Sequence, residues 1–200
     1  MTLTEFLAWQ ATQDRLYEFV DGEPVAMAGA QVRHDRITVN AIFEIRRQLR
    51  DGGSPCDVFT ADIGILTPKG RIRRPEMSVL CPPFDEDAVT SDRPRLVVEV
   101  LSESTADIDR FIKLDEYKAI RSIDYIIIVD PTRFAVGFWH RGDGGEWFGE
   151  MLTDADAVIE MPLLGLAVSL SALYQRVSVE PRLRPRLVDD PVSDSPASEG

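Results

Sequence analysis

Two glutamates at apolar, strand-like segments are the residues of this sequence best placed to do chemistry. Glu99 lies inside the most apolar run, from Arg95 to Ser102, and Glu76 directly precedes the apolar segment Met77–Cys81. A buried carboxylate is costly unless a cation, a metal or a raised pKa compensates it. Two carboxylates at neighbouring strand ends form an oxygen-rich site for a hard cation such as Mg²⁺. We therefore expect Glu76 and Glu99 to bind a metal ion together.

A lysine follows on the segment after the Glu99 strand. Asp109, Lys113 and Tyr117 are spaced four residues apart, which places them on one face of a helix. An amine beside the carboxylates would orient or deprotonate an attacking water and offset charge that builds on a phosphate. Glu76, Glu99 and Lys113 are thus a candidate set for metal-assisted chemistry on a phosphate.

Each candidate also has a structural interpretation. Glu99 would pair with an arginine at the edge of the core. Lys113 would be the exposed partner of Asp109, a pair that contributes about 0.3 to 0.5 kcal/mol. Tyr117 would pack in the core, and His34, near the start of a helix, would either contact phosphate or make a structural hydrogen bond.

The elements that must position these residues are a mixture of helices and strands. Periodic apolar residues predict helices over Leu3–Ala11, Val32–Arg50, Asp109–Ile120 and Leu170–Val177. Apolar runs between turn residues predict strands over Asp57–Leu66, Met77–Cys81, Leu96–Leu101 and Tyr125–Asp130, and hairpins around Asp21-Gly22 and Gly142–Gly145. An all-apolar strand reached through a helix implies a crossover connection into a sheet. The fold class is therefore α/β (α+β), with a mixed β-sheet flanked by helices.

Length and composition suit a single domain. The 200 residues are 44% hydrophobic and 28% charged, and we expect one domain over residues 1–180 followed by a disordered acidic tail over 181–200. No apolar run approaches the roughly 18 to 20 residues of a membrane span, so we expect no membrane association and a cytoplasmic location. The net charge of −12 disfavours nonspecific binding to polyanions. Cys56 and Cys81 are far apart in sequence, and we expect both to be reduced thiols.

A series of motifs resembles the Uma-type family of bacterial restriction endonucleases, within the PD-(D/E)XK nuclease superfamily. The matching segments are Tyr17-Glu18-Phe19-Val20-Asp21-Gly22-Glu23, His34, Arg74-Pro75-Glu76, Val98-Glu99-Val100-Leu101-Ser102-Glu103-Ser104-Thr105, the trio Asp109, Lys113 and Tyr117, and Ile126-Ile127-Ile128-Val129-Asp130-Pro131. Weaker matches continue to Leu173-Tyr174. Each segment alone is weak evidence, but their order and spacing together are specific.

The resemblance implies a restriction-endonuclease-like fold and a nuclease site. By resemblance, Glu76 and Glu99 would ligate Mg²⁺, or Mn²⁺ in its place, with the Val100 carbonyl as a further ligand and DNA as the partner. Lys113 would be the catalytic lysine, which in this family comes from the following helix. Leu101 occupies the usual lysine position two residues after the acid, so Lys113 takes the role only if that helix packs beside the strand.

One departure from the family pattern bears on activity. The family usually has Asp where this chain has Glu76, and the extra methylene moves the carboxylate by more than an ångström in a site that tolerates little error. Glu18 would be an accessory acid by resemblance, or else a solvated strand residue.

Three functions stay open on these residues. The first is a Mg²⁺-dependent endonuclease acting on DNA. The second is a protein of the same fold that has lost efficient catalysis and acts as a nucleic-acid-binding or regulatory module, which the Glu76 replacement and the acidic composition favour. The third is a structural homo-oligomer, such as a homodimer, formed through an exposed sheet edge at the hydrophobic hairpin from Phe134 to Trp139.

Overall fold

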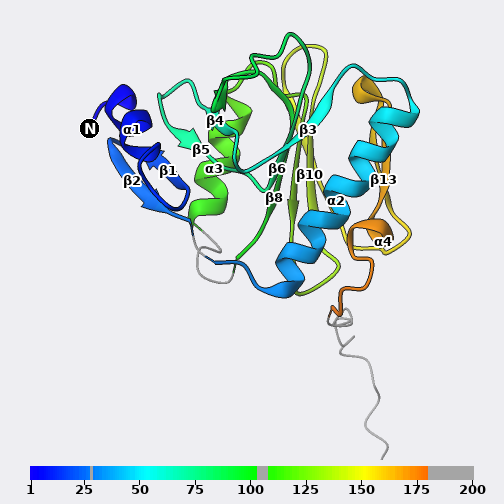
Figure 1. Ribbon diagram of the computed structural model, residues 1–200. Coiled ribbons are helices and arrows are strands. Elements are labelled where there is room, and N and C mark those ends of the chain that lie inside the picture. The colour runs from blue at the N-terminus through cyan, green and yellow to red at the C-terminus, as the bar shows by residue number, and fades with distance from the viewer. Residues whose placement is uncertain (28, 103–107, 180–200) are drawn as a thin grey trace, which may run out of the picture.

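The core of the fold is a six-stranded mixed β-sheet in the order β11-β10-β9-β8-β6-β3 (Figure 1). The computed structural model describes residues 1–27, 29–102 and 108–179. The strands of this sheet are β3 (Asp57–Thr60), β6 (Met77–Leu80), β8 (Pro94–Val100), β9 (Tyr125–Val129), β10 (Val136–Arg141) and β11 (Trp147–Leu152). Strands β8 and β9 are parallel and the other neighbours are antiparallel. This confirms the predicted mixed sheet and its crossover.

Smaller sheets extend the structure beside the main one. A five-stranded sheet has the order β2-β1-β5-β4-β7, and a separate hairpin pairs β12 with β13. Their bounds are β1 (Tyr17–Val20), β2 (Glu23–Ala26), β4 (Gly64–Leu66), β5 (Ile72–Arg73), β7 (Thr90–Ser91), β12 (Val158–Met161) and β13 (Leu166–Ser169). The β1–β2 hairpin turns at Asp21 and Gly22, both with positive φ, as the Asp-Gly turn predicts.

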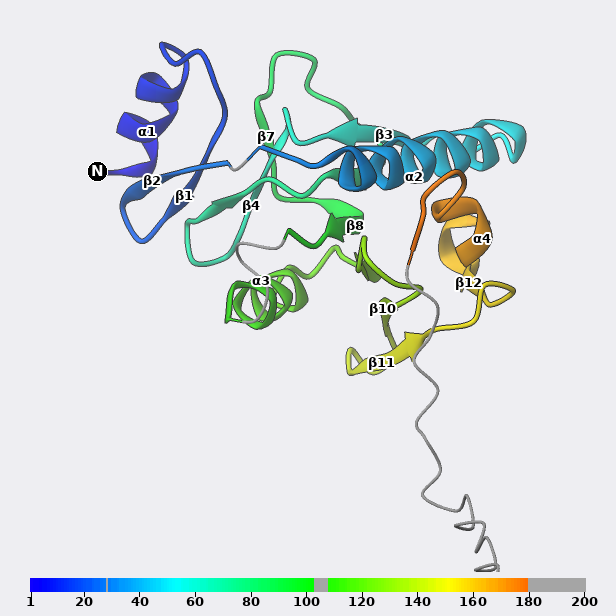
Figure 2. The ribbon, with the colours of Figure 1, turned by 90° about the horizontal axis from the view of Figure 1, so that it is seen from below.

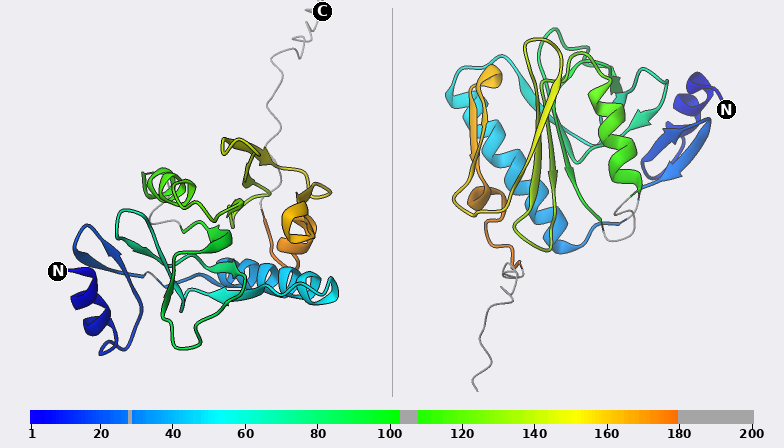
Figure 3. Two further views of the ribbon diagram at one scale, coloured as in Figure 1. Left: turned by 90° about the horizontal axis from the view of Figure 1, so that it is seen from above. Right: turned by 180° about the vertical axis from the view of Figure 1, so that it is seen from behind.

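Helices cover both faces of the main sheet. They are α1 (Leu3–Gln10), α2 (Val32–Asp51), α3 (Ile108–Lys118) and α4 (Leu170–Leu173), with a 3₁₀ turn at Pro162–Leu164. Seen from below, α2 and α3 lie on opposite sides of β8 (Figure 2). The view from behind places α3 in front of the sheet, between the main strands and the β1–β2 hairpin (Figure 3). Helix α3 connects β8 to β9, so the helix after the Glu99 strand packs beside that strand.

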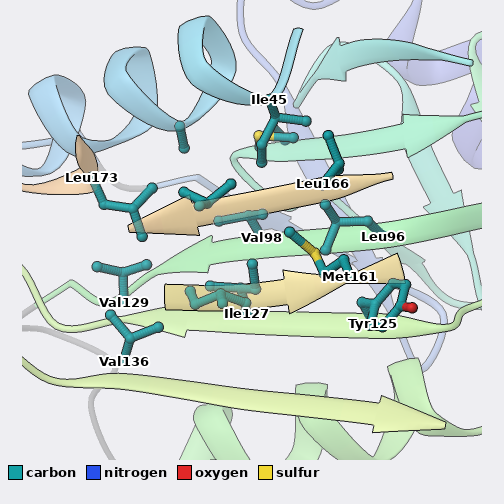
Figure 4. Packing of buried hydrophobic residues seen from close by; sticks show 14 of the residues in the cluster. Ile45, Leu96, Val98, Tyr125, Ile127, Val129, Val136, Met161, Leu166 and Leu173 are labelled. Carbon is teal, nitrogen blue, oxygen red and sulfur yellow. The ribbon is translucent and has the colours of Figure 1, made fainter. Parts of the chain in front are cut away.

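The larger core fills the space between the sheet and α2. The predicted stripe at every fourth residue of α2 is confirmed, because Ile37, Ala41, Ile45 and Leu49 are all buried. These side chains pack on alternate residues of the central strands and on the β12–β13 hairpin (Figure 4). A second core lies under α3 on the other face of the sheet. Glu99 belongs to the strand that both cores enclose.

Two predicted elements have different bounds in the structure. The predicted strand Asp57–Leu66 is wrong as one element: a turn at residues 61–63 divides it into β3 and β4, which join different sheets. The Arg74 guanidinium donates to the carbonyls of Ala61 and Asp62 and so fixes this turn. The closing helix ends at Leu173, short of the predicted Val177, because Arg176 has a φ of +59°.

Strand β10, which lies in the segment from Phe134 to Trp139 and its continuation, is not an edge strand of the sheet. Strand β10 lies between β9 and β11, so its backbone is paired on both sides. The edge strands of the main sheet are β3 and β11. The segment Phe134 to Trp139 therefore offers no free edge itself, because β10 is paired on both sides, whereas its hairpin partner β11 is an edge strand. The homo-oligomer stays a prediction.

The two cysteines form a disulfide, which contradicts the expectation of reduced thiols. Cys56 precedes β3 and Cys81 follows β6, and the antiparallel register pairs Asp57 with Leu80. The two cysteines are therefore opposite each other at the next pair, with their Cα atoms 4.0 Å apart. The two cysteines are 25 residues apart in sequence, and only the pairing of β3 with β6 brings them together.

Further expectations concern membrane spans, the residues near the end of the chain and the segment after β8. In the part of the chain that the structure describes, no helix is long and apolar enough to cross a membrane. The predicted tail over 181–200 and the motif residues Ser104 and Thr105 lie outside the described residues.

Candidate active site

The main sheet places Glu76 and Glu99 opposite each other. Met77 of β6 pairs with Val98 of antiparallel β8, and the next pair in that register is Glu76 with Glu99. Side chains of opposite residues lie on the same face of a sheet, about 5 Å apart at their Cβ atoms. The two carboxyl groups are hydrogen-bonded to each other. The pair predicted from sequence is thus brought into direct contact.

Glu99 is buried beneath α3. Its Oε1 accepts a 2.6 Å hydrogen bond from the Tyr117 hydroxyl and lies 3.5 Å from Lys113 Nζ. Burial raises the pKa of Glu99 to about 8, with the neighbouring carboxylates of Glu76 and Glu18 adding to the effect against the opposing charge of Lys113. The sequence also allowed a salt bridge between Glu99 and an arginine. The cation beside Glu99 is instead a lysine, Lys113.

Glu76 remains the more acidic member of the pair. Burial raises its pKa, but hydrogen bonds from His34 and from the Val100 amide outweigh burial, so that the pKa is lowered. The Val100 amide donates to Glu76 Oε2 at 2.8 Å. Two carboxyl groups in contact cannot both ionise easily. In the absence of a bound cation, the pair therefore shares a proton.

Lys113 has two acidic partners from different elements. Its Nζ lies 2.9 Å from Glu18 Oε1 and 3.5 Å from Glu99 Oε1. These carboxylates raise the pKa of Lys113 despite its burial, so the amine is cationic. The Lys113–Asp109 alternative is not tested, because the side chain of Asp109 lies outside the described residues.

Glu18 is buried in the β1–β2 hairpin, which excludes the solvated strand residue offered as its alternative. Its side chain is 8% exposed, and it accepts from Arg73 Nη1 at 2.8 Å and from the Arg74 amide at 3.1 Å. The cationic neighbours lower the pKa of Glu18, although burial acts in the opposite direction. Glu18 is therefore an ionised carboxylate that holds Lys113.

His34 is the site residue that sequence reasoning placed least well. It lies in the first turn of α2, and its Nε2 is 3.0 Å from the Val100 carbonyl oxygen and 3.2 Å from Glu76 Oε1. The Glu76 carboxylate raises the pKa of His34 against the effect of burial. The Nδ1 atom is buried without a hydrogen-bond partner in the described part of the chain, which assigns the imidazole proton to Nε2. The early motif position of His34 was the signal available in the sequence.

These side chains line one cavity of about 170 Å³. Glu18, His34, Glu76, Glu99 and Lys113 all contribute to its wall, together with the end of β8 and the segment between β2 and α2. The cavity is larger than the share of one water molecule in liquid water, about 30 Å³. It admits a small ion with its water ligands.

The donor set fits a hard cation with few protein ligands. Among the described residues, no group of three or more His, Cys, Asp or Glu side chains has the spacing to enclose a metal ion by itself. Glu76, Glu99 and Val100 line the cavity instead, and the Val100 carbonyl oxygen lies 3.0 Å from His34 Nε2. Mg²⁺ commonly binds through one or two carboxylates and completes its octahedron with water and a substrate phosphate. The arrangement suits such an open site and does not suit a closed structural one.

A family model described as "Putative restriction endonuclease", Uma2, matches residues 3–172. The chain belongs to the Uma2 family. The match contains every element that supplies a residue to the cavity, from the β1–β2 hairpin to β9. It ends at residue 172, within α4.

Similar proteins agree with this membership. The uncharacterized protein slr1290 of Synechocystis sp. is 30% identical over 173 residues, which covers 86% of this chain and 90% of that protein. The uncharacterized protein sll1609 of the same organism is 24% identical over 168 residues, or 82% and 94% of the two chains. The crystal structure of a putative nuclease belonging to DUF820 from Anabaena variabilis is similar with a TM-score of 0.70 and 19% identity, covering 87% of this chain and 97% of the other. The fold is accordingly restriction-endonuclease-like.

Other basic side chains lie away from the cavity. The exposed arginines of α2 have partners within the chain: Arg36 donates to the Arg176 carbonyl, and Arg47 pairs with Glu44 and Asp51. These contacts are typical of a solvated helix face. His140 stacks against aromatic rings on the main sheet, far along β10 from the acidic pair.

Proposed function

We propose that this Uma2-family chain is a Mg²⁺-dependent endonuclease that hydrolyses phosphodiester bonds in DNA, with Mn²⁺ able to replace Mg²⁺. The observation that carries the proposal is the convergence of Glu76, Glu99, the Val100 carbonyl and Lys113 on one cavity. Family membership supports a nuclease, and the name of the Anabaena structure agrees with it.

Each side chain receives a distinct role. Glu76, Glu99 and the Val100 carbonyl would hold the cation, whose chemistry is to polarise the phosphate and to make a bound water more acidic. Lys113 is cationic, so it acts as a hydrogen-bond donor that orients the water and stabilises negative charge on the phosphate, and not as a general base. Glu18 fixes the direction of the lysine amine. His34 holds the Glu76 carboxylate by its Nε2.

A catalytically weakened module that binds nucleic acid is the second candidate. The longer side chain of Glu76, where the family usually has Asp, is the observation that favours it. The hydrogen bonds that Glu76 accepts from His34 and from the Val100 amide nevertheless fix its carboxylate against Glu99. This orientation compensates for the longer side chain and favours the enzyme.

Calorimetry with Mn²⁺ and Mg²⁺ on the wild type and on Glu99→Ala, followed by plasmid and single-strand cleavage assays on the same samples, tests the proposal. Glu160→Gln is the matched control, because Glu160 is an exposed carboxylate on β12, outside the cavity. We expect metal binding and metal-dependent cleavage in the wild type and the control, and neither in Glu99→Ala.

Three results would count against the proposal or part of it. Absence of metal binding by the wild type at millimolar concentrations would remove the metal site. Metal binding without cleavage of any DNA substrate would favour the binding module. Preferential cleavage of RNA would keep the site and replace the substrate.

A further inference from the structure

Strand β5 and the residue before it carry an ionic cluster that lies outside the cavity. Arg71 and Arg73 both bind the carboxylate of Glu116, which is on α3. The side chains of Arg73 and Glu116 are only 5% and 2% exposed. Buried charges of this kind are costly to keep unless they are well paired, and replacing them with apolar residues is commonly neutral for stability. We therefore expect this cluster to have a role other than stability.

The geometry of Arg73 joins the two elements that hold the catalytic lysine. Its Nε donates to Glu116 Oε2 at 2.6 Å, and its Nη1 donates to Glu18 Oε2 at 2.8 Å. Glu18 comes from β1 and accepts the Lys113 amine with its other oxygen. A guanidinium has donors in a fixed planar fork, so binding one carboxylate sets the position of the other.

Glu116 and Lys113 are three residues apart on α3, which places them on neighbouring positions of one helix face. Anchoring Glu116 on β5 therefore fixes the rotation of α3 about its axis at the turn that carries Lys113. The same arginine fixes Glu18 from the opposite side of the lysine. Arg73 thus restrains both ends of the Glu18–Lys113 ion pair.

We propose that Arg73, together with its partner Glu116, is a positioning residue. It holds the Lys113 amine at its place beside Glu99, acting through Glu18 and through α3. Neither residue touches the reacting atoms. The inference rests on the proposed function for its effect on cleavage, but the placement of the lysine is measurable without any cleavage. Arg71 extends the cluster to Asp21 at the surface, at 2.5 to 2.8 Å, and closes it around Glu116.

The experiment compares Arg73→Gln, Arg73→Lys and Glu116→Gln with the control Arg95→Gln. Arg95 pairs with Asp124 at the far end of β8, so its replacement also removes an arginine–carboxylate pair but leaves the cavity intact. Thermal unfolding of each variant identifies those that fold. Glu116→Gln and Arg73→Lys retain size and most contacts, and so remain informative should Arg73→Gln fail to fold.

The first readout is competitive acetylation of lysines by acetic anhydride, read by mass spectrometry on the full-length protein. Lys69 and Lys118 are internal references. We expect Lys113 to react severalfold faster in both Arg73→Gln and Glu116→Gln, because an amine released from Glu18 is more accessible to the reagent. The two substitutions remove charges of opposite sign, so an increase in both variants reflects released geometry and not a change in local charge. Arg73→Lys should give an intermediate rate, and Arg95→Gln the wild-type rate. Unchanged Lys113 reactivity in both folded variants would overturn the proposal, even in a protein that cleaves nothing.

The second readout is the single-turnover cleavage rate with the DNA and Mn²⁺ dissociation constants. We expect Arg73→Gln to lower the rate by about tenfold or more, as misplacement of a catalytic group does, while both dissociation constants change far less. In a Lys113→Ala background the same substitution should have no further effect on the rate. An equal loss in that background, or a matching loss of Mn²⁺ affinity, would show that Arg73 acts otherwise and would overturn the proposal.

The two readouts separate the two claims. Faster Lys113 acetylation with no cleavage by the wild type would uphold the positioning of the lysine and refute the endonuclease. Cleavage by the wild type with unchanged acetylation and unchanged rate in the variants would do the reverse.

Discussion

Lys113 lies closer to Glu18 than to Glu99: the amine is 2.9 Å from Glu18 Oε1 and 3.5 Å from Glu99 Oε1. The tighter partner of the lysine thus comes from the first hairpin and not from the strand that carries the predicted metal ligand. This contact predicts that Glu18 aims the amine at the acidic pair.

Glu18→Gln should therefore impair cleavage more than metal binding. The amide keeps the size of the side chain but removes the charge that orients Lys113, so we expect the single-turnover rate to fall by about 10- to 100-fold. The Mn²⁺ dissociation constant, measured by calorimetry, should change far less. Glu23→Gln in the same hairpin is exposed and serves as the control. A Glu18→Gln variant with the wild-type rate would exclude this role.

Glu76→Asp tests the departure from the family pattern. If the chain is an enzyme, aspartate restores the usual side-chain length, and cleavage should be retained or raised. The measurement is a plasmid cleavage assay in Mg²⁺ and in Mn²⁺, with circular dichroism to establish that the variant is folded. Absence of cleavage in both proteins would indicate a binding module.

Tyr117→Phe should destabilise the fold around Glu99. The hydroxyl donates a 2.6 Å hydrogen bond to a carboxyl group that is buried, so its removal leaves an acceptor with one partner fewer. We expect the free energy of unfolding to fall by about 1 to 2 kcal/mol in urea titrations. Tyr17→Phe is the control, because the Tyr17 hydroxyl accepts only from Arg15 at the surface, and its loss should change stability by less than about 0.5 kcal/mol.

Glu116 should make the stability of the protein depend on acid pH. Hydrogen bonds from Arg73 and Arg71, with their charges, lower the pKa of Glu116 below its ordinary value of 4.5, although burial opposes them. A lowered pKa stabilises the fold fully above the pKa of the unfolded chain, and this contribution is lost as the pH falls through the folded pKa. Glu116→Gln should therefore differ most from the wild type in urea titrations at pH 7 and progressively less below about pH 4.5. A difference that is constant with pH would contradict the ion-pair origin.

The Cys56–Cys81 disulfide should contribute about 3 kcal/mol to stability, because it closes a loop of moderate length. Urea titrations with and without dithiothreitol measure this contribution. Alkylation of the purified protein before and after reduction, followed by mass spectrometry, should reveal free thiols only after reduction. A Cys56→Ser variant that is insensitive to dithiothreitol provides the control, and alkylation of unreduced wild type would contradict the pairing.

Local pattern in the sequence was sufficient for the elements that carry the acidic pair. The four-residue period of α2, the apolar runs of β8 and β9, and the helix between those strands each reflect burial of neighbouring residues in the chain. The same patterns placed Glu76 at a strand start and Glu99 in a strand interior. The four-residue spacing of Asp109, Lys113 and Tyr117 indicated Lys113, and the family motifs added Glu18; the roles of both stay predictions.

Tertiary structure decided which of these residues meet. The disulfide, the division of Asp57–Leu66 between two sheets, the contact of His34 with Glu76 and the binding of Glu18 and Glu116 by Arg73 all join segments that are distant in sequence. Such contacts depend on strand order and on the crossover between β8 and β9. The residue periods of helices and strands determine which face of an element is buried, but they carry no information on which element packs against it.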